Sequence, residues 1–316
     1  MLSADFVVSA VKIAPVITPG RLMTFVLPSA PRAIQSRGTP FFVEREHASN
    51  STPAVDPLTI VAIGLMVGVL ADFIHEGLGH GGACLLVGGK PTLLTSMNFG
   101  WDDTGSSRWA LRAVAAGGTI ANLLAGALAL AMLRRRSSLV HLHYFLWLFA
   151  AVNLYVGTGY FLYSGMSNIG DWANFIAGLP GHWLWRGLLT LLGGASYFLC
   201  VRMMLVKAAP LTGGDPALRY RRANLLMLIP YFAGGIMGVI AGALNPEAKA
   251  LLLISAVAAS LGGTSGLAWG PQMLRDPDWL VSSKPPAAIP RHWGWIVAGL
   301  LLAVLFVLIL GPGVKL

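Results

Sequence analysis

Long apolar stretches alternate with short polar ones along most of the chain. Each apolar stretch has about 20 residues, the length that an α-helix needs to cross the hydrocarbon core of a membrane. The pattern therefore predicts an all-α polytopic membrane protein with about seven transmembrane helices. The predicted spans cover residues 58–88, 109–133, 139–163, 183–206, 222–244, 248–269 and 293–311.

The polar stretches divide the chain into three regions. Residues 1–55 mix weakly apolar segments with Pro, Ser and Arg, and we expect a flexible N-terminal tail there. Residues 56–181 hold the first three spans, and we expect them to form the core, with a hairpin or re-entrant loop at 92–107. Residues 182–316 hold spans four to seven, which we expect to be accessory membrane helices.

Composition and charge agree with membrane insertion and predict an orientation. The chain is 55% hydrophobic and only 11% charged, with a formal net charge of +9. The basic residues lie in short clusters between the spans, led by Arg134 to Arg136 and by Arg219, Arg221 and Arg222. Such clusters mark cytoplasmic loops, so we expect a multi-pass protein of the plasma membrane with a cytoplasmic amino terminus. A nucleic-acid partner is disfavoured because it would require a basic surface on one soluble face.

The first predicted span contains the ionisable residues that stand out in the chain. Asp72, His75, Glu76 and His80 lie in an otherwise apolar segment, and Asp72 and Glu76 are the only acids inside any predicted span. A charged side chain at the centre of a spanning helix costs about 2.5–3.5 kcal/mol on insertion scales. Such residues normally mark a functional site, so we expect the chemistry of the protein here.

His75, Glu76 and His80 offer parts of a metal-dependent hydrolytic site. Imidazole nitrogens and carboxylate oxygens are ordinary zinc ligands, and a catalytic zinc usually has three protein ligands and one water position. His75, His80 and one carboxylate from elsewhere would supply the three ligands. Glu76 would then be free to take a proton from the bound water.

The spacing of the two histidines requires an irregular helix. At about 100° per residue, ligands at i and i+4 lie about 40° apart, whereas His75 and His80, at i and i+5, lie about 140° apart. Gly77 and Gly79 lie in this interval, and one inserted residue is what a π-bulge accommodates. We therefore expect an irregular turn across 76–80 that makes the two side chains face each other.

Two other arrangements remain open at this stage. Asp72, Glu76 and His80 follow one another at i, i+4 and i+8 on one stripe of a regular helix, so Glu76 could be a ligand instead of a base. The polar side chains could also form a hydrogen-bonded cluster that holds no metal.

Three segments resemble motifs of the site-2 protease family of intramembrane zinc metalloproteases. His75 to His80 resemble the family's His-Glu-x-x-His, residues 118–122 resemble its Gly-Pro-x-x-Asn, and Gly170-Asp171 resemble its distal Asp motif. Their order across three successive spans is also similar. The chain departs from the family in the extra residue of the first motif, in Thr119 in place of Pro, in the absence of an Asn-x-x-Pro element, and in Trp172 where Gly is expected.

The resemblance implies a three-helix metalloprotease-like core around one Zn²⁺ ion, formed by residues 56–181. It implies that His75, His80 and Asp171 bind the zinc, that Glu76 activates the water, and that Asn122 or Asn153 positions the substrate. The implied activity is hydrolysis of a peptide bond in a membrane-protein substrate, within or near the lipid bilayer.

Two other functions are compatible with the sequence. One is a different metal-dependent membrane hydrolase, for example one that acts on lipids, and the other is a non-proteolytic metal-binding membrane scaffold. A diiron oxidase is disfavoured, because such sites usually combine four carboxylates with paired Glu-x-x-His motifs, and only Asp72, Glu76 and Asp171 are well placed here.

Overall fold

The structure is a computed structural model that describes residues 54–134, 139–245, 257–276 and 285–316. Within these ranges six helices are long and apolar enough to cross a membrane, which confirms an all-α polytopic membrane protein. The predicted tail, residues 1–55, lies outside the described residues except for its last two positions. The six helices cover Pro57–Leu86, Arg108–Leu133, Val140–Ser167, His182–Lys207, Pro216–Ala243 and Trp293–Leu310.

The first span consists of three consecutive helical segments. They are α1 (Pro57–Phe73), the π-helix η1 (Ile74–Gly81) and α2 (Gly82–Leu86). α1 begins after Asp56, whose carboxylate accepts a hydrogen bond from the backbone N–H of Thr59 at 2.9 Å. Pro57 occupies the first helical position, where the backbone N–H of any residue would have no partner within the helix, so its lack of an N–H costs nothing.

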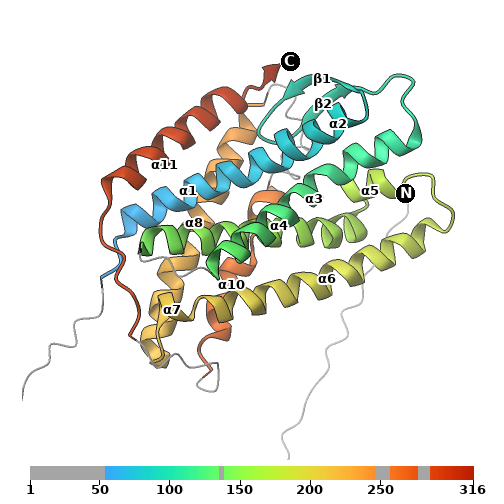
Figure 1. The fold of residues 1–316 in the computed structure, drawn as a ribbon. Helices are drawn as coiled ribbons and strands as arrows, with labels where there is room; N and C mark the ends of the chain where they lie inside the picture. The colour runs from blue at the N-terminus through green and yellow to red at the C-terminus, as the bar shows by residue number, and fades with distance from the viewer. Residues whose placement is uncertain (1–53, 135–138, 246–256, 277–284) are drawn as a thin grey trace, which may run out of the picture. The chain divides into compact units, whose positions relative to one another are not determined.

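Three long helices follow and alternate in direction: α3 (Arg108–Leu133), α4 (Val140–Ser167) and α6 (His182–Lys207) (Figure 1). α3 runs antiparallel to the first span. Glycines bring the helices close together, since a Cβ at Gly126 of α3 would lie 2.7 Å from the Leu154 side chain of α4. Small residues at such crossings are typical of helices that associate in membranes.

The helices of the second half pack directly on the first span. They are α7 (Ala209–Thr212), α8 (Pro216–Ala243), α10 (Gly266–Met273) and α11 (Trp293–Leu305), with the π-helices η2 (Ala258–Gly262) and η3 (Phe306–Leu310). A Cβ at Gly64 of α1 would lie 2.7 Å from Pro230 of α8, and Gly299 of α11 lies against the backbone of Ala62. α8 and α11 thus form part of the packing around α1, and the expectation that spans four to seven are accessory helices stays a prediction.

The predicted span at 248–269 is an interrupted segment in the residues that the structure describes. Residues 246–256 lie outside the described part, and the remainder forms η2 and α10 with a turn between them. Ser260 lies beside Gly238 of α8, whereas the carbonyl of Leu274 accepts a hydrogen bond from Arg219 near the start of α8. The segment therefore runs back along α8, which predicts a seventh passage in addition to the six described helices that are long enough to cross by themselves.

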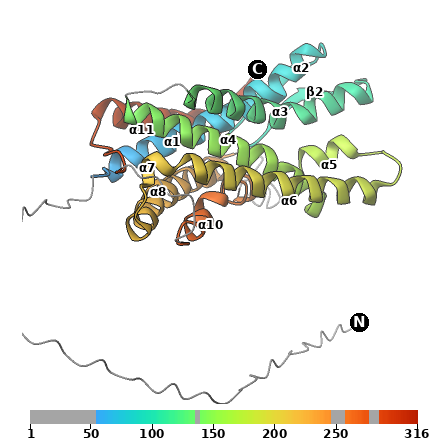
Figure 2. The same cartoon turned by 60° about the horizontal axis from the view of Figure 1, so that its bottom comes forward.

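A small sheet and a short helix lie at one end of the bundle. β1 (Lys90–Leu94) pairs antiparallel with β2 (Phe99–Asp102), as the predicted hairpin requires, and β3 (Val314–Lys315) pairs with the other edge of β1. The short helix is α5 (Asp171–Ile176). β2 and α5 lie toward the same end of the bundle and α7 toward the other (Figures 1 and 2).

Two arginines of the predicted cytoplasmic cluster are buried. Arg219 is 1% exposed and donates hydrogen bonds to the backbone carbonyls of Leu274 and Asp276. Arg222 is 2% exposed and donates to the carbonyls of Leu211 and Ala287. These guanidinium groups satisfy backbone acceptors of the connecting loops, so they stabilise this end of the bundle in addition to adding positive charge.

Candidate metal centre

The π-helix η1 makes His75 and His80 face each other. It covers Ile74–Gly81, and both histidines are buried. Their ring centroids lie 4.9 Å apart in an edge-to-face arrangement. The irregular turn predicted from the i, i+5 spacing is thus confirmed, because the wider helical turn absorbs the extra residue.

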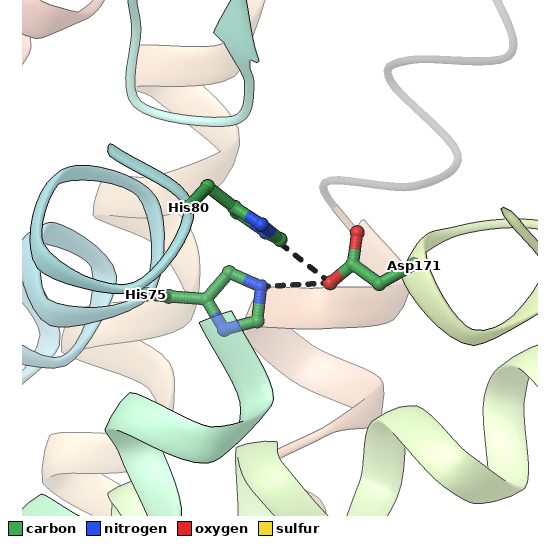
Figure 3. A group of neighbouring side chains, drawn as sticks. All are labelled: His75, His80 and Asp171. Atoms are coloured by element: carbon green, nitrogen blue, oxygen red, sulfur yellow. Dashed lines mark hydrogen bonds and ion pairs between the residues drawn. The ribbon is translucent and has the colours of Figure 1, made fainter. Parts of the chain in front are cut away.

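Asp171 reaches both histidines from a different part of the chain (Figure 3). His75 Nε2 lies 3.0 Å and His80 Nε2 lies 3.4 Å from Asp171 Oδ2. The break before α5 places this carboxylate, since Asn168 adopts φ 57° at the end of α4 and Gly170 adopts φ 87°. The ligand atoms of the three residues lie within 4.8 Å of one another, so this group could hold a metal ion.

The Nδ1 atom of each histidine, the ring nitrogen that faces away from Asp171, forms a hydrogen bond with an oxygen acceptor. His75 Nδ1 lies 2.6 Å from Asn122 Oδ1, and His80 Nδ1 lies 2.7 Å from the backbone carbonyl oxygen of Val114. An acceptor at Nδ1 holds a proton there and directs Nε2 at the site, where Nε2 donates to Asp171 when it is protonated and could bind a metal ion once that proton has left. Histidines that bind metals almost always donate their other N–H in this way.

Glycines allow α3 to come close enough to provide these acceptors. A Cβ at Gly79 would lie 2.5 Å from the Gly118 Cα, and a Cβ at Gly118 would lie 2.5 Å from His75 Nε2. The backbone of α3 therefore rests against η1, a close approach that only residues without side chains permit. The Gly-Gly pair at 117–118 in the second span is a sequence signal for this contact.

Asn122 and Asn153 form a fully buried amide network behind His75. Asn122 Nδ2 donates to the carbonyl of Ala71 at 3.0 Å and to Asn153 Oδ1 at 2.8 Å, and Asn153 Nδ2 donates to the carbonyl of Phe149 at 2.9 Å. Both donors of Asn122 are therefore used within the protein. A role of these residues in positioning a substrate stays a prediction, whereas Asn122 does orient His75 in this structure.

Two of the four departures from the family motifs, Thr119 and Trp172, contact each other. The indole Nε1 of Trp172 donates to Thr119 Oγ1 at 3.0 Å, which ties α5 to α3 beside Asp171. Arg112 of α3 adds a second tie by donating from Nε to the carbonyl of Phe175 at 2.9 Å. The Thr119–Trp172 pair depends on tertiary proximity, so reading each motif alone could not find it.

Asp171 is ionised in this environment. Burial by itself would raise the pKa of Asp171, but hydrogen bonds from His75 and His80 and their positive charge hold that pKa below its ordinary value. An anionic oxygen between two imidazole nitrogens is a suitable donor set for a divalent cation.

Glu76 is buried beside this group but is not part of it. Its side chain borders a cavity together with Asp72 and His75. The ligand group that lies within 4.8 Å contains His75, His80 and Asp171. The geometry therefore disfavours the arrangement in which Asp72, Glu76 and His80 share a metal, and the role of Glu76 as a base stays a prediction.

Tyr160 is a member of the site that sequence reasoning missed. Its ring stacks on His75 with centroids 4.7 Å apart and an interplanar angle of 24°. It comes from α4, within a Tyr-rich stretch that gives no indication of which tyrosine faces the histidines.

Comparison with protein-family models, with curated proteins and with solved structures finds no match to this chain. The case for a function therefore rests on the geometry of the site.

Proposed function

We propose that this protein is an intramembrane zinc metalloprotease that hydrolyses peptide bonds of membrane-protein substrates within or near the bilayer. The observation that carries the proposal is the pair of buried histidines whose Nδ1 atoms are held by acceptors while both Nε2 atoms face one carboxylate. Zinc fits two imidazole nitrogens and one carboxylate oxygen with a fourth position left for water.

Glu76 is the base in this proposal. A bound zinc ion supplies Lewis-acid polarisation and a water molecule whose pKa is lowered to about 7. The Glu76 carboxylate accepts the proton of the attacking water and passes it to the leaving amine nitrogen. Asn122 and Val114 keep the two imidazoles in one orientation, so little reorganisation is needed during the reaction.

The site lies inside the first span but near one of its ends. His80 precedes the end of α2 at Leu86 by six residues, which corresponds to about 9 Å along a helix. This end is opposite to the end of the bundle that holds Arg134, after α3, and Arg219, near the start of α8. If the amino terminus lies on the cytoplasmic side of the plasma membrane, the site lies in the outer half of the bilayer. Its substrates would then be segments that are themselves embedded in the membrane.

The test combines metal content with peptide cleavage. Protein purified in detergent without chelators should contain about one zinc per chain by mass spectrometry, and His80→Ala should lose it. In liposomes that hold a library of transmembrane peptides, the wild type should produce chelator-sensitive fragments. Glu76→Gln should keep the metal and lower the cleavage rate by about 10²–10⁴-fold.

Other results would assign a different function. A wild-type protein without metal would rule out a metalloenzyme and leave the hydrogen-bonded cluster. Metal without cleavage of any peptide would favour a binding scaffold or a hydrolase of another substrate, such as a lipid. Equal loss of metal in Glu76→Gln and His80→Ala would make Glu76 a ligand.

A further inference from the structure

A cavity of about 120 Å³ opens next to the candidate metal centre on the side of Glu76. It extends between α1, α4, α8 and the segment that contains Ser260 and Thr264, and His75 is the member of the ligand group that lines it. Most of its wall is apolar, with Val152 and Val156 from α4 and Met237 from α8. Its position makes it the space that a group bound beside Glu76 would occupy.

Glycines on two helices line this space. Gly64 and Gly68 of α1 and Gly234 and Gly238 of α8 all line the cavity. A Cβ at Gly234 would come no closer than 3.7 Å to the Gly64 carbonyl oxygen, which is an ordinary contact. An alanine therefore fits at Gly234, whereas a longer side chain there would fill the cavity.

Two buried polar atoms in the wall have no partner among the described residues. They are Asp72 Oδ2 and Ser96 Oγ, and both side chains border the cavity. Ser96 is only 5% exposed. Buried polar atoms are nearly always hydrogen-bonded, so each orphan needs an explanation, and a bound ligand supplies one.

We propose that the cavity is a specificity pocket for a substrate side chain with an aromatic ring and a terminal hydroxyl group, as in tyrosine. This inference rests on the proposed function, since it names the substrate class of that site. The cavity of about 120 Å³ is somewhat smaller than the roughly 150 Å³ cavity that is known to hold benzene, so a single ring is about the largest group that it can take. A phenolic hydroxyl both donates and accepts, so it suits either of the two unpaired atoms, Asp72 Oδ2 or Ser96 Oγ.

Other side chains suit the pocket less well. An aliphatic alcohol such as threonine would leave most of the apolar wall uncovered. An ammonium group would bring its charge against Val152, Val156 and Met237, where it loses its hydration. With the ring in the cavity, the adjoining peptide bond lies beside Glu76, which also lines it.

The pocket can be tested without proteolysis. The purified wild-type protein in detergent is titrated with p-cresol, toluene and benzylamine, and binding is followed by the shift of the thermal unfolding midpoint. We expect p-cresol to bind at least tenfold more tightly than toluene or benzylamine. Asp72→Leu, which has a similar size but no acceptor, should bind p-cresol and toluene equally.

Variants that fill the cavity separate pocket binding from partition into detergent. Gly234→Leu should abolish both p-cresol and toluene binding, and Gly234→Ala should retain them. Val156→Phe fills the cavity from the opposite wall and serves the same purpose if Gly234→Leu does not fold. Equal shifts for p-cresol and toluene in the wild type, tighter binding of benzylamine, or unchanged shifts in both filled variants would overturn the proposal.

Peptide cleavage then links the pocket to the reaction. A cleaved transmembrane peptide should lose about tenfold in rate when its tyrosine at the cleavage site is replaced by phenylalanine, but only in proteins that keep Asp72. Selective p-cresol binding without cleavage of any peptide would overturn the protease assignment and retain the pocket. Cleavage that ignores this replacement would overturn the pocket assignment and retain the protease.

Discussion

At the scale of single residues, the site depends on which nitrogen of each histidine carries a proton. Asn122 and the carbonyl of Val114 occupy the two Nδ1 positions, which directs both Nε2 atoms at Asp171. The contribution of Val114 is a backbone oxygen, so the type of side chain at 114 gives no signal for it. The two acceptors therefore act on the metal site although neither one faces the metal position.

Loss of the Asn122 acceptor should weaken metal binding. Asn122→Ala leaves His75 Nδ1 without its partner at 2.6 Å, so the ring can rotate and change its tautomer. Substitutions at such supporting positions typically lower metal affinity 10–100-fold. The zinc dissociation constant, measured by competition with a chelator, should rise by that factor.

Thr158→Val is a matched control for Asn122→Ala. Thr158 is also buried and polar, but its hydroxyl donates to the carbonyl of Leu154 within α4. Its zinc affinity should stay close to that of the wild type. Equal affinities in all three proteins would show that the Asn122 bond has no effect on the metal.

The ligand residues could be predicted to different extents from sequence. His75 and His80 stand out because so few ionisable residues occur in the spans, and this follows from the energetics of membranes. Asp171 was predicted as a ligand only from the family resemblance. A Gly-Asp pair by itself also occurs where a new helix begins, so it does not distinguish a metal ligand from a helix cap. The position of Asn122 behind His75 depends on the register between α1 and α3, which no local pattern contains.

At the scale of helices, the extra residue of the His-Glu motif is accommodated by η1. Its i, i+5 spacing was informative because a regular helix would separate the two ligands by about 140°. The strand β3 was not predicted, since two residues at the chain end have no pattern until β1 is beside them. The interruption between η2 and α10 likewise lies within an apolar stretch that predicts one continuous helix.

Close contact between η1 and α3 predicts different effects for two glycines in the first span. A Cβ at Gly79 would lie 2.5 Å from the Gly118 Cα, and the rigid backbone there cannot easily move away. A Cβ at Gly82 meets nothing within 4 Å. Gly79→Ala should therefore destabilise the protein by about 1–3 kcal/mol and displace His80, whereas Gly82→Ala should be neutral.

Thermal unfolding and zinc content of the two variants provide the measurement. Gly79→Ala should have a lower unfolding midpoint and less bound zinc than Gly82→Ala, which has the same change in composition. If both variants behaved like the wild type, α3 would not rest on η1 in the way described here.

At the scale of the whole molecule, the beginnings of the first and last spans are joined. The N–H of Asp56 donates to the carbonyl of Ile289 at 2.8 Å, and Arg291 Nε lies 3.0 Å from Asp56 Oδ2. α1 and α11 thus start at the same end and run in the same direction. Residues so distant in sequence give no joint signal, so this pairing is known only from the structure.

The Asp56–Arg291 pair should make stability depend on pH in the acid range. Burial by itself would raise the pKa of Asp56, but hydrogen bonds from Thr59 and Arg291 and the charge of Arg291 lower it below its ordinary value. An Asp carboxyl in an unfolded chain has a pKa of about 4. The ion pair therefore stabilises the folded state above this pH, and its contribution is lost as the pH falls through the lowered pKa of Asp56. The temperature of the unfolding midpoint should therefore decrease as the pH is lowered from about 5 to about 3.

Asp56→Asn isolates this effect because asparagine still caps a helix but carries no charge. Its unfolding midpoint should vary less with acid pH, and added salt should narrow the difference from the wild type. Asp103→Asn, which removes an exposed carboxylate at the other end of the bundle, should retain the wild-type slope. An identical slope in Asp56→Asn would mean that the ion pair contributes nothing.

The last prediction concerns how many times the chain crosses the membrane. Because the segment with η2 and α10 returns along α8, α11 starts at the end where α1 starts, and Leu316 lies opposite to the loops that are predicted to be cytoplasmic. In a protein with Cys84 and Cys200 replaced by Ala, single cysteines at Thr104 and Leu316 should react with an impermeant reagent added outside intact cells, and a cysteine at Arg134 should not. Reaction at Thr104 but not at Leu316 would contradict the seventh passage, and reaction at Arg134 alone would place the amino terminus outside. The distribution of basic residues predicts the first pattern, since Arg134 belongs to a cluster of the kind that marks cytoplasmic loops.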